Sequence, residues 1–69
     1  MVEVFKTNVQ KKAVTNYIIS IFKTHFPDYK VNFDLEDCDK ILRIEAEKLD
    51  SNKIVEYVNS IGYQCIKLE

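Results

Sequence analysis

The stretch that most constrains the fold is VNFDLEDCDKILRIEA, residues 31–46, which has the pattern of a β-hairpin. Two runs alternate apolar with polar residues on either side of a polar tip: Val31, Phe33 and Leu35 before it, and Leu42, Ile44 and Ala46 after it. Alternation with a period of two is typical of strands that bury one face. A shift of one residue would turn each apolar set to water, so the pattern also predicts the register.

The remaining elements can be placed around this hairpin. Residues 2–6 are expected to form a strand, and residues 63–68 another. A helix is expected from Thr7, interpreted as the N-cap of a capping box with Gln10, to about Phe26, because Pro27 follows. A second helix is expected from Asp50 or Ser51, with the buried stripe Ile54, Val55, Val58 and Ile61. Gly62 fits the position just past its end.

The order β-α-β-β-α-β predicts one domain, residues 1–69, with the ferredoxin-like α+β fold. In this fold an antiparallel sheet of order 4-1-3-2 carries two helices on one face. Three loops are expected to meet at one end of the sheet, and they contain Thr7 and Asn8, then Asp37 and Cys38, then Gly62 and Tyr63. His25 and Pro27 are expected at the opposite end.

Bulk properties exclude several classes of protein. A net charge of −1 gives no general attraction to nucleic acid or to a membrane surface. The chain has no secretory leader pattern and no apolar run long enough to span a bilayer. Two cysteines do not form a disulfide framework. We therefore expect a cytoplasmic, reducing environment.

The cysteines and the histidine are the candidate reactive or metal-binding residues. Cys38 lies between Asp37 and Asp39, which disfavour a thiolate, so we interpret it as a turn residue. A metal-ligand or redox role for Cys38 is the alternative. Cys65 is expected to be buried and inert, and His25 to lie at the surface near a helix end. No base, nucleophile and oxyanion donor occur together, so we do not expect an enzyme.

The face of the sheet without helices is a candidate interaction surface. If Val2 and Val4 face the helices, Phe5 lies on the open face, and Ile41 lies beside it. Ile66 can extend this apolar area, and Arg43 and Glu45, with Glu3, would form a polar rim. Such a cluster predicts a contact with a protein partner or with a second copy.

The whole chain resembles the heavy-metal-associated (HMA) domains, the copper-chaperone family. The resemblance is carried by VNFDLEDCDKILRIEAE followed by LDSNKIVEYVNSIGY, and Ile61-Gly62-Tyr63 is its most specific piece. The family binds metal through Met-x-Cys-x-x-Cys in the loop after the first strand. Here that loop, residues 6–12, is KTNVQKK and contains no Cys, Met or His. The soft thiolate ligands that Cu(I) requires are therefore missing.

The resemblance and the missing motif together predict a small HMA-like domain without a metal cofactor, acting as a protein-binding or self-associating module. The alternative is an atypical copper or zinc carrier that uses Cys38. An RNA-recognition motif fits less well, because it needs aromatic residues on the central strands. The third strand offers Ile41, Arg43 and Glu45 at alternate positions, so we expect no nucleic-acid partner.

Overall fold

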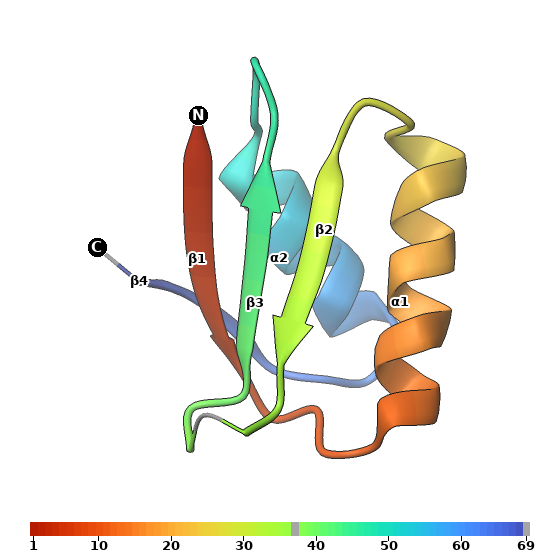
Figure 1. The fold of residues 1–69 in the computed structure, drawn as a ribbon, viewed down its shortest axis with the longest axis vertical. Coiled ribbons are helices and arrows are strands. Elements are labelled where there is room, and N and C mark those ends of the chain that lie inside the picture. Colours follow the sequence, from red (N-terminus) through yellow and green to blue (C-terminus); the bar gives the residue numbers. More distant parts are fainter. Residues whose placement is uncertain (37, 69) are drawn as a thin grey trace.

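The computed structural model describes residues 1–36 and 38–68 of the chain. Along these residues the elements are β1 (Val2–Thr7), α1 (Lys12–His25), β2 (Lys30–Asp34), β3 (Ile41–Glu45), α2 (Ser51–Ser60) and β4 (Cys65–Leu68) (Figure 1). The described strands form one antiparallel sheet in the order β2-β3-β1-β4, which confirms the predicted ferredoxin-like arrangement. No helix among the described residues is both long enough and apolar enough to cross a membrane.

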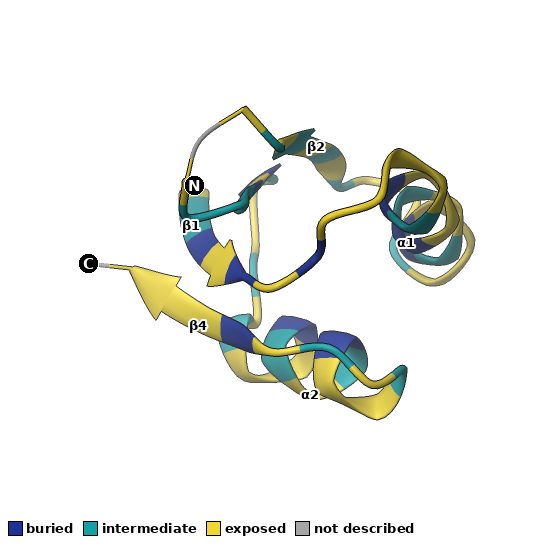
Figure 2. Cartoon of the chain, turned by 90° about the horizontal axis from the view of Figure 1, so that it is seen from below, coloured by how far each residue is buried: buried dark blue, intermediate teal, exposed yellow. Residues whose placement is uncertain are grey.

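α2 crosses behind the strands in Figure 1 and α1 lies beside β2, and the front face of the sheet carries no helix. The core lies between the sheet and the helices. It consists of fully or almost fully buried apolar side chains: Phe5, Val9, Ile18, Phe22, Leu42, Ile44, Ile54, Val58 and Cys65. Figure 2 shows that the buried residues of α2 lie on the side of the helix that faces the sheet.

The hairpin has the register that its alternation predicts. Val31 pairs with Ile44, and Phe33 pairs with Leu42. Leu42 and Ile44 are completely buried, whereas Val31 and Phe33 are only partly buried because β2 is an edge strand.

The prediction for the first strand was wrong by one residue. Phe5 is completely buried, and Val2, which was expected in the core, is 46% exposed. Phe5 pairs with Leu42, and directly paired residues share a face of the sheet. This orientation places Glu3 on the helix-covered side and Lys6 on the open face, and Glu3 is neutralised there by Lys67 at 3.4 Å. Burial of the large Phe5 side chain also removes more apolar area from water than burial of a valine.

The first helix begins later than the capping-box pattern predicts. α1 starts after Lys11, which makes no side-chain capping hydrogen bond, and Thr7 is the last residue of β1. The Thr7 hydroxyl instead donates to the Lys40 carbonyl oxygen at 2.6 Å. The other helix boundaries follow the prediction. α1 ends at His25 before Pro27, and the Asp50 carboxylate accepts from the Lys53 N–H at 3.3 Å at the start of α2.

Gly62 follows α2 with φ = +96°, a backbone conformation in which an L side chain is strained. This confirms its predicted role just past the helix end.

Candidate functional site

The loops at one end of the sheet meet as the topology predicts. The Thr7 N–H donates to the carbonyl oxygens of Asp39 and Lys40, which ties the end of β1 to the hairpin tip. The Asn8 side-chain oxygen accepts from the Gln64 N–H at 2.8 Å, which ties the first loop to the segment before β4. The polar side chains of this loop thus hold backbone together.

The candidate residues at this loop end that the structure describes are not arranged as a metal site. Cys38 is exposed, and Asp37 lies outside the described residues. Asp39 forms an ion pair with Lys6 at 3.6 Å, and Tyr63 is half-buried beside Asn8 in a shallow hollow of about 300 Å³. Within residues 1–36 and 38–68, no group of three or more His, Cys, Asp or Glu side chains is arranged to hold a metal ion.

Cys65 is buried in the core, as predicted. Burial desolvates the thiolate form, which raises the pKa of the Cys65 thiol to about 11. At neutral pH the side chain is therefore an uncharged thiol, neither a nucleophile nor a soft metal ligand.

His25 is exposed near the end of α1, as expected, and its ring lies 5.1 Å from the Tyr57 ring. Tyr57 also contacts Phe22 and Phe26 and belongs to the rim of the core. These contacts give the aromatic side chains at this end of α1 a packing role.

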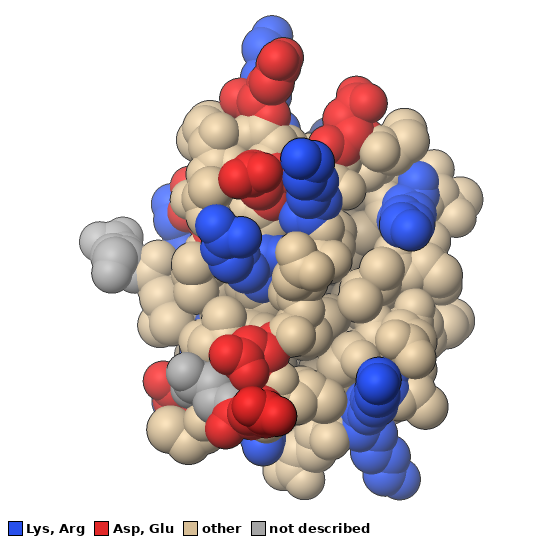
Figure 3. All heavy atoms as spheres, in the orientation of Figure 1, with Lys and Arg blue, Asp and Glu red and all other residues tan. Residues whose placement is uncertain are grey.

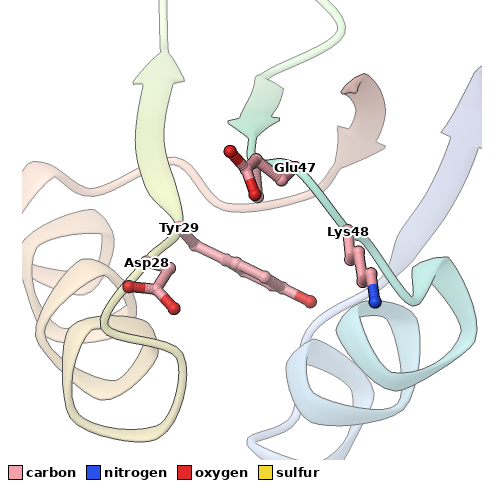
Figure 4. A pocket seen from close by; sticks show the side chains of 5 residues that line it. Asp28, Tyr29, Glu47 and Lys48 are labelled. Atoms are coloured by element: carbon pink, nitrogen blue, oxygen red, sulfur yellow. The ribbon is translucent and has the colours of Figure 1, made fainter.

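A larger hollow, of about 500 Å³, lies at the end of the sheet opposite the hairpin tip. Figure 4 shows the Tyr29 side chain extending across it, with Asp28 and Glu47 on either side and Lys48 near the phenol group. The Tyr29 ring stacks on Phe26 at 4.8 Å, and its hydroxyl oxygen accepts from the Asp50 N–H at 3.5 Å. Sequence analysis missed this hollow because two turns far apart in the chain form it. Its charged groups have mixed signs and lie in an open depression, so they define no specific chemistry.

The open face of the sheet divides into a polar half and an apolar half. On β2 and β3, the residues of this face are mainly charged or polar: Lys30, Asn32, Asp34, Ile41, Arg43 and Glu45. Lys30 and Glu45 form an exposed ion pair at 3.9 Å. On β1 and β4, Lys6 is the only charged residue of this face, and the others are Val2, Val4, Ile66 and Leu68. We call these four residues the apolar patch.

The apolar patch is both exposed and continuous. Ile66 is 59% exposed, Val2 46% and Leu68 37%. Val4 pairs directly with Leu68, so the patch crosses from one strand to the next. Figure 3 shows uncharged surface on this side of the face, at the level of β4 in Figure 1, with charged side chains above and below it.

The predicted interaction surface is therefore partly correct. Ile41, Arg43 and Glu45 lie on the open face, but Phe5 and Glu3 do not. Glu3 lies opposite the buried Ile44, and the apolar residues beside β3 are Val2 and Val4. VEVFKT has a charged residue on either face, Glu3 on one and Lys6 on the other, so the sequence carried no signal that could have located Val2 and Val4 there.

Comparisons with known proteins identify no relative. No family model matches the chain, and neither a curated protein nor a solved structure matches it.

Proposed function

We propose that this chain is a small, non-enzymatic, HMA-like domain without the family's metal ligands, and that it binds another protein through the apolar patch. The partner is either a different protein or a second copy. The observation that carries the proposal is the patch itself, because exposed apolar side chains that gather in one place mark contact surfaces more often than scattered ones do.

The distribution of exposed apolar side chains supports this proposal. The large apolar residues most exposed on the described surface are Met1, Val2, Tyr17, Ile66 and Leu68. Three of these five belong to the patch, on two adjacent strands. Burying them against a partner would remove apolar area from water without breaking any ion pair of the polar half.

The first loop supports the part of the proposal that concerns metal. In HMA domains this loop carries the thiolates, whereas here Thr7 and Asn8 use their side chains to hydrogen-bond the backbone of neighbouring loops. Lys11 and Lys12, at the start of α1, would in addition repel a cation.

The experiment compares the wild-type chain with the double variant Val4→Thr/Leu68→Thr. Threonine keeps the β-branched shape of Val4, and it is favourable in a strand at position 68 as well. Its hydroxyl makes the patch polar while the fold is retained. The readouts are sedimentation velocity over a dilution series and quantified recovery of proteins from an extract of the cells that make the chain. Tyr17→Ser is the matched control, because Tyr17 is 58% exposed and lies on α1.

We expect self-association or the recovery of a partner to fall at least tenfold in the double variant and to remain unchanged in the control. A wild-type chain that stays monomeric and recovers the same proteins as the double variant would overturn the proposal.

Metal titration tests the alternative. Native mass spectrometry of the reduced chain with Cu(I) or Zn(II) should detect no stoichiometric complex. Asn8→Cys/Lys11→Cys, which restores the spacing of two thiolates, should bind Cu(I) and serves as the positive control. Stoichiometric binding by the wild-type chain that Cys38→Ser abolishes would identify a metal carrier instead.

A further inference from the structure

The two edges of the sheet are protected to different degrees. β2, at one edge, presents Lys30, Asn32 and Asp34 on the open face, and α1 lies beside it (Figure 1). β4, at the other edge, presents Ile66 and Leu68 on that face, and its charged residue, Lys67, lies on the helix-covered side and pairs with Glu3 at 3.4 Å. Its pairing with β1 runs without a bulge from Thr7–Cys65 to Val4–Leu68, and it contains no proline. Charges, bulges and proline are the features that normally prevent an edge strand from pairing with another chain.

The side chains of β4 have a neighbouring strand on one side only. Lys6 lies beside Ile66, and Val4 lies beside Leu68, but the described chain places no strand on their outer side. Figure 2 shows β4 as exposed beyond Cys65. A second strand at this edge would supply the missing cross-strand contacts and would pair the outward-facing N–H and C=O groups.

We propose that β4 pairs antiparallel with β4 of a second copy, about a two-fold axis at Ile66. This proposal rests on the proposed function, because it specifies the partner and the geometry of the same patch. In this register Ile66 lies opposite Ile66 of the second copy, and Leu68 lies opposite Gln64. Both patches then lie on the same face of one continuous sheet.

Charge and the alternation of side chains favour this register. A two-fold axis at Lys67 would place two like charges directly opposite each other, which is unfavourable. A two-fold axis that passes between two residues would place residues of the helix-covered face of one copy opposite residues of the open face of the other. The axis at Ile66 avoids both arrangements. Lys67 then lies opposite Cys65, and each residue lies opposite a residue of the same face. With a net charge of only −1, two copies also approach each other with little long-range repulsion.

The size of the edge predicts a weak dimer. A stable interface takes about 800 Å² from each partner. The described chain has an accessible surface of 4719 Å², so such an interface would cover about one sixth of it. β4 has four residues and is about 13 Å long, which is too short for that area. We therefore expect association that reverses on dilution.

Cross-linking tests the geometry. In Cys38→Ser chains, Ile66→Cys should form a disulfide between copies under mild oxidation, because directly opposite residues have Cβ atoms about 4.5–5.5 Å apart. Val2→Cys is the matched control, because Val2 is similarly exposed on the same face. In the proposed dimer the two Val2 positions are separated by three strand spacings, about 14 Å, across the sheet and by about 27 Å along the strands, because Val2 lies four residues from Lys6, the partner of Ile66. We expect the Ile66→Cys dimer to form at least tenfold faster. Equal rates for the two variants would overturn the proposal.

Sedimentation equilibrium tests the association without cross-linking. Ile66→Lys places two ammonium groups directly opposite each other at the axis, so its dissociation constant should rise at least tenfold. A thermal melt monitored by circular dichroism checks that this variant is folded. If it is not, the cross-linking rates of Ile66→Cys and Val2→Cys decide whether the proposed dimer forms. A wild-type chain that is monomeric at all concentrations would overturn this proposal. The proposed function would survive that result if the Val4→Thr/Leu68→Thr variant lost the recovery of a different protein.

Discussion

The two faces of the sheet are made from neighbouring residues with opposite environments, and β1 shows this most clearly. Phe5 is completely buried under the helices, whereas the adjacent Val4 lies on the open face among exposed apolar side chains. Both residues are apolar, so their difference comes from the partners that surround them. The comparison predicts that substitutions on the helix-covered face cost much of the domain's stability, whereas substitutions on the open face cost little.

The largest expected effect is on the helix-covered face. Phe5→Ala should lower the free energy of unfolding by about 3–5 kcal/mol, because it leaves a cavity between Leu42 and the helices. Urea denaturation measures the change, with Tyr17→Ala as the exposed control. For a domain of this size the variant should be mostly unfolded. A loss below about 1 kcal/mol would show that Phe5 is not a core residue.

Cys65 gives the helix-covered face a dependence on alkaline pH. Its pKa is about 11 in the folded chain, compared with 9.0 for an ordinary cysteine. The folded state therefore retains a proton that the unfolded state loses, and stability falls as pH rises from 9 to 11. The loss from this group should reach about 2–3 kcal/mol, at 1.36 kcal/mol per pKa unit.

Cys65→Val should remove this part of the pH dependence. The free energies of unfolding of wild type and variant, measured at pH 7 and above pH 10, give the difference directly. Parallel pH profiles for the two chains would contradict the raised pKa.

Thr7 is the buried polar residue of β1, and its effect should be smaller. Its hydroxyl donates to the Lys40 carbonyl oxygen and accepts from the Val9 N–H at 3.3 Å. Thr7→Val removes both hydrogen bonds and should cost about 1–2 kcal/mol, because a buried N–H loses its partner. Thr24→Val is the comparison, because Thr24 also makes a hydroxyl hydrogen bond, at 3.0 Å, but is exposed. Equal losses of unfolding free energy in the two variants would show that burial does not increase the contribution of the Thr7 hydrogen bonds to stability.

The smallest expected effect on folding is on the open face. Val4→Thr should change the free energy of unfolding by no more than about 0.5 kcal/mol, since surface substitutions have effects of this size. The same variant should weaken association. A loss of stability as large as that of Phe5→Ala would remove the contrast between the two faces.

Sequence reasoning located the elements whose patterns are unambiguous. The hairpin alternates cleanly in both strands, so its position and register could be predicted. The sequence VEVFKT of β1 fits either face, because Val2 and Val4 favour one orientation and Phe5 the other. Either orientation also places one charged residue on the helix-covered face, and in the structure this residue is Glu3, which pairs with Lys67 at 3.4 Å. Thr7 and Gln10 have the spacing of a capping box, but the Thr7 hydroxyl donates instead to the carbonyl oxygen of Lys40, which is 33 residues away in the chain.

The candidate site was predictable only in part, for the same reason. The convergence of the three loops followed from topology alone, and the Asn8–Gln64 hydrogen bond confirms that two of them meet. The apolar patch depends on the orientation of β1, and the hollow beside Tyr29 depends on two turns that approach each other in space. Neither has a local sequence signal.

The pairing of β1 with β4 also determines where the two ends of the described chain lie. Val4 is opposite Leu68, so Met1 and Leu68 leave the sheet from the same end of adjacent strands (Figure 1). A short glycine-rich linker could therefore join them, and new ends could be opened at the turn that contains Pro27 and Asp28, between α1 and β2. Such a circular permutant would keep every strand neighbour of the original fold while changing the order in which the strands are synthesised.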